Sequence, residues 1–179
     1  METKSLQNYL TKELSRIFGK SLVEREWDIS KNSKDKITKK FYCPRLDIAV
    51  GPFNITSNIH INLEKIEKYK VKYKHLINDL KKYSIISNFN LNLNMNPRCF
   101  IAIEIEKSGS RKHMLGDIAN SSMMGKIGIV IPIGDEKLKH FKRIKDYVDF
   151  VSKNKKIPSK YNNIIIIKPE DFIKILKKY

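Results

Sequence analysis

The sequence has few of the residues that build zinc sites and lacks the long apolar runs that cross membranes. Its two cysteines, Cys43 and Cys99, lie far apart and form no C-x-x-C pair, and its 4 histidines show no zinc-ligand spacing. No apolar run reaches the ~18 residues of a membrane helix, and residues 1–20 are amphipathic and charged. We therefore expect no structural zinc, no membrane partner and a soluble, cytoplasmic protein.

Acidic residues are also scarce. Lys and Arg total 36 against 19 for Asp and Glu, which gives a formal net charge of +17. This excess favours a polyanionic partner such as nucleic acid or an acidic membrane surface. An alternative interpretation attributes part of it to composition, because Ile, Lys and Asn are all abundant, as an A/T-rich genome would make them. The 41% of hydrophobic residues is enough for one ordinary core.

Hydrophobic periodicity predicts helices alternating with strands, which is typical of an α/β fold. Helices are expected over 5–18, 63–83, 114–122 and 138–151 and from residue 169 onward, and strands over 23–29, 46–50, 89–95, 99–107, 127–133 and 164–167. A polar, lysine-rich loop is expected over 30–40. Because no internal repeat or linker is visible, we expect a single domain spanning 1–179.

Three acidic residues lie on predicted strands at positions where they can meet. In the strand over 46–50 the apolar residues share one face, so Asp47 lies on the other. In the strand over 99–107 the isoleucines share one face, and Glu104 and Glu106 project together from the other. Hard divalent cations prefer such oxygen ligands, and phosphodiester hydrolysis uses a cation to polarise water and to neutralise phosphate oxygens.

A lone acid on one strand followed by Glu-x-Glu on a later strand resembles the PD-(D/E)xK nuclease superfamily, which includes restriction endonucleases and Holliday-junction resolvases. The motifs are Pro44–Asp47 (Pro-Arg-Leu-Asp) and Glu104–Glu106 (Glu-Ile-Glu), and the resemblance covers about residues 5–133. It implies a restriction-endonuclease-like core of helix, three strands, helix and strand, with a mixed central sheet flanked by helices. It also implies DNA as substrate, with Asp47 and Glu104 as ligands of Mg²⁺ and Mn²⁺ as an alternative ion.

The sequence departs from the superfamily pattern at Glu106, which stands where lysine is usual, although some restriction enzymes of this kind use Glu-x-Glu. Glu106 would then be the general base or a second metal ligand. Lys107 should point to the opposite face of the strand, so Lys112 or Lys126 on the following helix would reach in instead, and Lys126 is the catalytic candidate. Many members add a glutamate from the first helix to the metal site, and Glu13, on the apolar stripe of that helix, matches this role.

Two basic segments are candidate nucleic-acid contacts. The helix over 63–83 falls in an insertion, about 60–84, between the strands that carry Asp47 and Glu104, so its lysines would lie beside the site. The alternative is a solvated lysine face on a core-packing helix. A second segment opens the 114–122 helix, where backbone N–H groups combine with positive side chains. The candidate nucleic-acid-binding residues are Lys65, Lys68, Lys72, Arg111 and Lys112.

The sequence thus predicts a Mg²⁺-dependent DNA endonuclease with a helix-strand-helix extension over 134–179, and symmetric cutting of a duplex favours a homodimer. Asp117 and Asn120, one helical turn apart, either hold a partner, support the site or form an ordinary pair on a helix surface. Two other functions stay open. One is a nucleic-acid-binding module of the same fold that lost catalysis with the lysine, and the other is a protein-interaction subunit whose lysines are only compositional.

Overall fold

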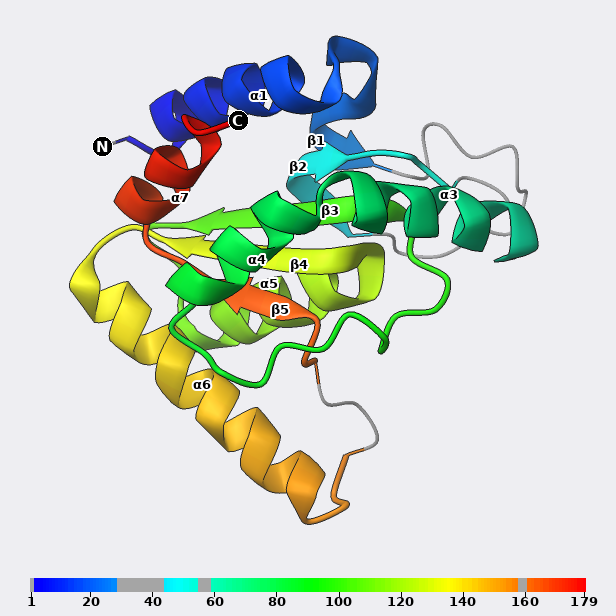
Figure 1. Cartoon of the computed structure of the whole chain (residues 1–179). Coiled ribbons are helices and arrows are strands. Elements are labelled where there is room, and N and C mark those ends of the chain that lie inside the picture. The colour runs from blue at the N-terminus through cyan, green and yellow to red at the C-terminus, as the bar shows by residue number, and fades with distance from the viewer. Residues whose placement is uncertain (1, 29–43, 55–58, 158–160) are drawn as a thin grey trace.

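The computed structural model describes residues 2–28, 44–54, 59–157 and 161–179 (Figure 1). In chain order the elements are α1 (Thr3–Phe18), a 3-10 turn (Lys20–Leu22), β1 (Val23–Asp28), β2 (Arg45–Val50), α3 (Ile59–Lys72), α4 (Lys74–Tyr83), β3 (Cys99–Glu106), α5 (Arg111–Met124), β4 (Gly125–Pro132), α6 (Asp135–Lys153), β5 (Ile164–Ile166) and α7 (Pro169–Leu176). The predicted α/β class, with a mixed sheet flanked by helices, is confirmed. The loop expected over 30–40 lies outside the described residues.

The five strands form one sheet in the order β1-β2-β3-β4-β5. The β1–β2 and β2–β3 pairs are antiparallel, whereas the β3–β4 and β4–β5 pairs are parallel. α5 makes the crossover that two parallel neighbours such as β3 and β4 require. Every residue of β3 and β4 is buried except Glu106, which explains why both strands are so rich in isoleucine.

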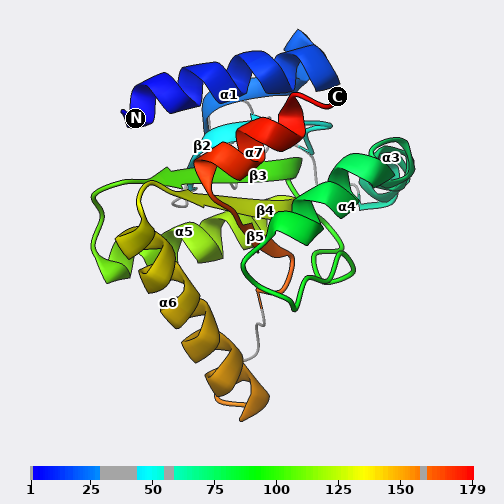
Figure 2. The same cartoon turned by 60° about the vertical axis from the view of Figure 1, so that its left-hand side comes forward.

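Helices cover both faces of the sheet (Figures 1 and 2). The isoleucines of β3 and β4 pack against α1, α4 and α7, and the largest hydrophobic cluster fills this layer. The opposite face packs against α5 and α6 around Met114, Val130 and Phe141. Because strand side chains alternate between faces, Asp47 and Glu104 belong to this second face, on the side that α5 covers.

α1 follows the predicted periodicity. Leu6, Leu10 and Leu14 have no exposed surface, so their stripe is buried in the core as expected for an amphipathic helix. The helix ends at Gly19, whose φ of +98° is rare for any residue with a side chain. α7 lies beside α1 on the same face of the sheet (Figure 2), and the Arg16 side chain joins the two by donating to the Leu176 carbonyl.

The long helix predicted over 63–83 is wrong in one respect, because it is two helices. α3 and α4 are separated at Tyr73, whose backbone angles (φ −105°, ψ 22°) are not helical. The Tyr73 ring packs against Phe18 and Phe100 in the core. This packing lets α4 lie along the sheet while α3 extends to one side (Figure 1), and the apolar periodicity runs through the break without showing it.

The strand predicted over 89–95 is wrong. The segment is an irregular loop in which Leu93 and Met95 are exposed. Its asparagines bond to backbone groups: Asn94 donates its side-chain amide to three carbonyls at the end of α5, and Asn90 accepts from the backbone two residues ahead. Asparagines used in this way favour turns over strands, so the alternation of Leu and Asn misled the prediction.

α6 is the longest helix of the described residues, and its C-terminal half projects beyond the sheet (Figures 1 and 2). The chain returns from it to β5, which adds a buried strand at the edge of the sheet. None of the described helices combines the length and the apolar content needed to cross a membrane.

Candidate acidic site

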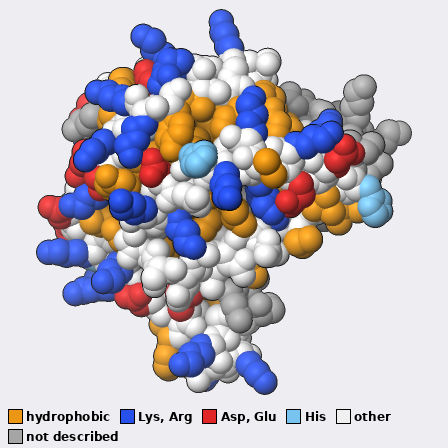
Figure 3. Space-filling view, in the orientation of Figure 1, with side chains coloured by type: hydrophobic (Ala, Val, Ile, Leu, Met, Phe, Trp, Pro, Cys, Tyr) orange, Lys and Arg blue, Asp and Glu red, His pale blue; other side chains and the backbone are white. Residues whose placement is uncertain are grey.

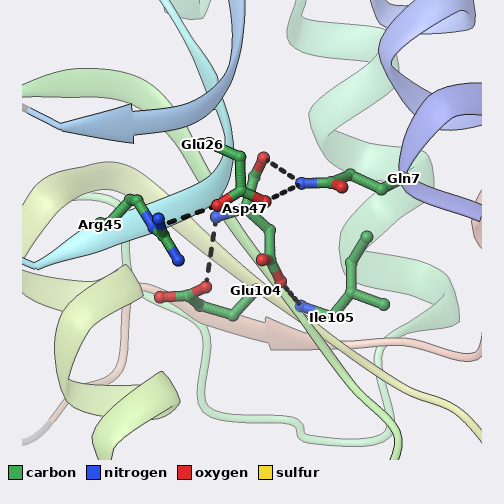
Figure 4. Close-up of polar contacts among 6 residues, drawn as sticks. All are labelled: Gln7, Glu26, Arg45, Asp47, Glu104 and Ile105. Carbon is green, nitrogen blue, oxygen red and sulfur yellow. Dashed lines mark hydrogen bonds and ion pairs between the residues drawn. The ribbon is translucent and has the colours of Figure 1, made fainter. Parts of the chain in front are cut away.

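Asp47 and Glu104 meet where the ladder between β2 and β3 ends. The last paired residues are Ile48 and Ile103, so the next step of the register sets Asp47 opposite Glu104. Instead of a further backbone pair, the Asp47 N–H donates to Glu104 Oε2 at 3.4 Å, and the Ile105 N–H donates to Asp47 Oδ2 at 2.7 Å (Figure 4). Each carboxylate therefore accepts from a backbone N–H of the other strand in place of a backbone partner, and the charge of Asp47 acts on Glu104.

Gln7 of α1 fixes the other side of Asp47. Its side-chain amide donates to the Asp47 carbonyl and to Glu26 Oε1, both at 2.8 Å (Figure 4). Glu26 has a φ of +49° and is skipped in the pairing of β1 with β2. The Glu26 backbone is therefore not a ladder partner of Asp47. Glu26 also makes an ion pair with Arg45 at 3.0 Å. Sequence reasoning missed Gln7 and Glu26, because only the left-handed backbone at Glu26 opens the ladder there.

Glu106 turns back onto the loop that follows β3. Its carboxylate accepts from the Gly109 N–H, and the Gly109 carbonyl accepts in turn from Lys137 Nζ at 2.7 Å. A Cβ at Gly109 would overlap the Glu106 carboxylate, so glycine is required for this close approach. Glu106 therefore stands at the edge of the acidic site with one oxygen engaged by the backbone.

α5 adds Asp117 and Asn120 to the site. The Asn120 side chain donates to Glu104, and the charge of Asp117 acts on Glu104. Asp117 Oδ2 is buried and has no hydrogen-bond partner among the described residues. The structure places both Asp117 and Asn120 at the site, so they are not an ordinary pair on the helix surface. We call Asp47, Glu104, Glu106 and Asp117 the acidic cluster.

Burial and mutual repulsion raise the pKa values of Asp47, Glu104 and Asp117. Burial raises the pKa of Glu104 to about 9, and the charges of Asp47 and Asp117 add to this. Burial, with the charges of Glu106 and Asp47, raises the pKa of Asp117 to about 7. The pKa of Asp47 is raised by burial and lowered in part by its hydrogen bond from Ile105. Near neutral pH the cluster thus retains protons that carboxyl groups in water have lost.

Glu13 and Lys126 are not brought to the acidic cluster. Glu13 pairs with Arg16 at 3.0 Å on the side of α1 that faces α7. Lys126 lies at the start of β4, not on a helix, and its Nζ donates to the Asn94 carbonyl at 2.8 Å. Both predictions were based on position along the sequence. In the structure, the side chains of Glu13 and Lys126 contact other neighbours of their helix and strand.

The candidate nucleic-acid contacts all lie on the surface. Lys65, Lys68 and Lys72 are exposed on α3, where Lys68 pairs with Glu64 at 2.7 Å. Lys and Arg side chains are spread over the whole face shown in Figure 3, not gathered in one patch. Arg111 and Lys112 are exposed at the N-terminus of α5, away from this group.

The carboxylate oxygens of the acidic cluster are the kind of ligand that a hard divalent cation prefers. They are not arranged around a common point in this structure. Among the described residues no group of three Asp, Glu, His or Cys side chains is spaced to hold a metal ion as it stands. Asp47, Glu104 and Glu106 each use a carboxylate oxygen to accept from a backbone N–H group. Asp117 Oδ2, which has no hydrogen-bond partner among the described residues, is an atom that fits such an ion.

Comparison of the chain with protein-family models, with curated proteins and with solved structures finds no match. What the protein does is therefore inferred from the acidic cluster and from the surface around it.

Proposed function

We propose that the protein is a metal-dependent endonuclease that hydrolyses DNA phosphodiester bonds at the acidic cluster. The observation that carries this proposal is the contact of Asp47 with Glu104 at the open end of the β2–β3 ladder. The charge of Glu106 acts on Asp47 and on Asp117, and the charge of Asp117 acts on Glu104. The element order from α1 to β4, apart from α3 and α4, is that of the restriction-endonuclease-like core which the sequence resembles.

Mg²⁺, or Mn²⁺ in its place, would be held by Asp47 and Glu104, with Asp117 as a further ligand. When bound, the cation polarises water and neutralises the phosphate oxygens. Burial and repulsion raise the pKa values of Glu104 and Asp117, and the two positive charges of the ion would relieve the repulsion, so ion binding and loss of protons are coupled.

The remaining groups have positioning roles in this proposal. Gln7 holds the carbonyl of Asp47, and thus the strand segment that carries its carboxylate. The Gly109 N–H holds Glu106 near the site, where its free oxygen can take a proton from the attacking water. A net charge of +17 attracts the substrate. Cutting both strands of a duplex symmetrically would add a homodimer to the proposal.

A second candidate is a nucleic-acid-binding protein of the same fold without catalysis. The observation in its favour is the lack of a lysine at the acidic cluster among the described residues: the charges that raise the pKa of Glu104 are both negative, and Lys126 lies elsewhere. The third possibility, a protein-interaction subunit, predicts no affinity for nucleic acid even at low salt.

Plasmid cleavage with Mg²⁺ or Mn²⁺ separates these functions. We expect wild type and Glu13→Gln to nick or cut the plasmid, because Glu13 lies away from the acidic cluster, and Asp47→Asn and Glu104→Gln to be at least ~100-fold slower. Equal rates in all four proteins would refute the assignment. DNA binding without cleavage in any of them would favour the second candidate.

Calorimetric titration with Mn²⁺ gives a readout independent of activity. The wild type should bind the ion and release about one proton, measured by repeating the titration in buffers of different ionisation enthalpy. Glu104→Gln should remove the proton release and weaken binding, whereas Glu13→Gln should change neither. A folded wild type that binds no Mn²⁺ would exclude the metal site.

A further inference from the structure

A groove lies between α5 and α6, away from the acidic cluster. It encloses about 1100 Å³ on the sheet face opposite α1 and α7, and Figure 2 shows the two helices on this side of the sheet. Its walls are mainly apolar, with Ala119 on α5 and Ile144, Val148 and Val151 on α6. We call it the α5–α6 groove.

Gly116 leaves the floor of the α5–α6 groove open. It lies in the middle of α5, where glycine costs about 1 kcal/mol relative to alanine. A Cβ built there would meet no atom within 4 Å outside its own stretch of helix. Neither a tight turn nor close packing within the described chain explains this glycine, so the space above it is available to a second molecule.

The charged residues that line the α5–α6 groove all carry positive charge. They are Arg111, Lys112, Arg143 and Lys156, with His140 beside them. None of the four Lys and Arg side chains has an ion-pair partner among the described residues, and no Asp or Glu lines the groove. The rim therefore favours a ligand with negative charge outside its contact surface.

Large apolar side chains extend the groove onto the surface. Leu115 is 43% exposed and Tyr147 is 65% exposed at its walls, and Phe150, one turn beyond Tyr147, is 62% exposed. Exposed apolar residues that adjoin an apolar groove are typical of a surface that binds another protein.

We propose that the α5–α6 groove binds an acidic amphipathic helix of a partner protein. The α6 wall runs from His140 to Val151, about 17 Å of helix, which matches a partner of about three turns. The apolar floor accepts the apolar face of that helix, and the cationic rim pairs with acidic residues at its edges. This inference does not depend on the nuclease proposal.

Other occupants fit the groove less well. A second copy of this chain would bring a net charge of +17 against a cationic rim. Nucleic acid would satisfy the rim, but its phosphates and base edges would leave the apolar floor of Ile144 and Val148 uncovered.

Fluorescence anisotropy with a labelled synthetic peptide tests the proposal. The probe is a peptide of about 12 residues with Leu and Phe along one helical face and Glu elsewhere, and its control is a scrambled peptide of the same composition. We expect the amphipathic peptide to bind the full chain at least ~10-fold more tightly than the scrambled one. Equal binding of the two peptides would overturn the proposal, because charge alone would then explain the affinity.

Variants locate the binding site. Gly116→Phe fills the floor and should weaken peptide binding at least ~10-fold, and Arg143→Glu should do the same through the rim. Lys74→Glu makes the same charge change at an exposed position of α4 and should leave binding unchanged. Gly116→Ala serves as the folding control, since it should raise Tm and keep most of the affinity.

Amide chemical shifts and competition complete the test without relying on any variant. The peptide should shift resonances of α5 and α6 around Gly116 and Val148, and a single-stranded oligonucleotide should not displace it at low micromolar concentration. Shifts confined to α3 and α4, or full displacement by the oligonucleotide, would overturn the assignment to a protein helix.

Discussion

At the scale of single residues, burial raises the pKa of Glu104 to about 9 and that of Asp117 to about 7. Burial is the main cause of both raised pKa values, and each carboxylate also repels its neighbours. The folded protein keeps these protons to a higher pH than the unfolded chain does. Between about pH 5 and pH 9 it therefore binds more protons than the unfolded chain, and this contribution to the free energy of unfolding falls as pH rises.

Asp117→Asn should therefore stabilise the protein at alkaline pH. We expect the free energy of unfolding to increase by roughly 1–2 kcal/mol near pH 8, with little change near pH 5, because only the charged form of Asp117 is penalised. Urea unfolding at several pH values measures this. Asp146→Asn, which removes an equally negative but exposed side chain of α6, should not show the same pH dependence. A loss of stability in Asp117→Asn at pH 8 would mean that a cation holds the carboxylate.

Gln7→Met should destabilise the protein by about 1–3 kcal/mol at neutral pH. Methionine keeps the volume of the side chain but leaves the Asp47 carbonyl and Glu26 Oε1 without the amide donor. Lys12→Met on the exposed side of α1 is the matched control and should change stability by less than about 0.5 kcal/mol. Equal effects of the two variants would show that the Gln7 hydrogen bonds add nothing to stability.

Strand alternation was enough to place Asp47, Glu104 and Glu106 on one face of the sheet, since it depends only on the period of two. It did not reveal Gln7, because its role depends on the left-handed backbone of Glu26. Nor did it show that Glu106 turns to Gly109, because a side-chain rotamer is chosen by the loop that follows the strand.

At the scale of elements, α5 contributes residues to both the acidic cluster and the α5–α6 groove. Asp117 and Asn120 face the acidic cluster, while Gly116 and Ala119 line the α5–α6 groove. The C-terminus of α5 is held by the side chain of Asn94, which donates to three carbonyls at 2.9–3.1 Å. The loop predicted to be a strand is thus a cap for the helix that carries part of the site.

Asn94→Ala should cost about 1–2 kcal/mol of stability, because the carbonyls at the end of α5 lose their donor. Asn92→Ala, two residues earlier on the exposed side of the same loop, should have almost no effect. Thermal unfolding compares the two, and each 1 kcal/mol corresponds to a change in Tm of about 2–4 °C for a chain of this size. Indistinguishable Tm values would contradict the capping role.

Helices and strands were predicted correctly where a residue pattern is compatible with only one kind of element. The buried isoleucines of β3 and β4 and the leucine stripe of α1 allow only a central strand and a core-facing helix. The segment over 63–83 keeps helical periodicity across Tyr73, so the break is set by aromatic packing with Phe18 and Phe100, which are distant in sequence. Tertiary packing of this kind overrides local pattern.

At the scale of the whole molecule, Lys and Arg side chains are spread over the face shown in Figure 3, whereas in the acidic cluster Glu104 is buried and Asp47, Glu106 and Asp117 are half-buried. A diffuse charge attracts DNA from any direction, while contacts beside a site must come from particular lysines. In the nuclease proposal these are Lys65, Lys68 and Lys72 on α3, which all remain exposed.

The salt dependence of DNA binding distinguishes specific contacts from diffuse attraction. Each phosphate contact adds about 0.9 to the slope of log affinity against log salt for duplex DNA, so replacing Lys65, Lys68 and Lys72 together by alanine should lower the slope by about 2–3 if all three contact phosphates. The matched control replaces three exposed lysines near α1, namely Lys4, Lys12 and Lys20. It removes the same charge and should lower the slope by less than about 1. Equal reductions in both triple variants would assign DNA binding to the overall charge and remove α3 from the proposed contact surface.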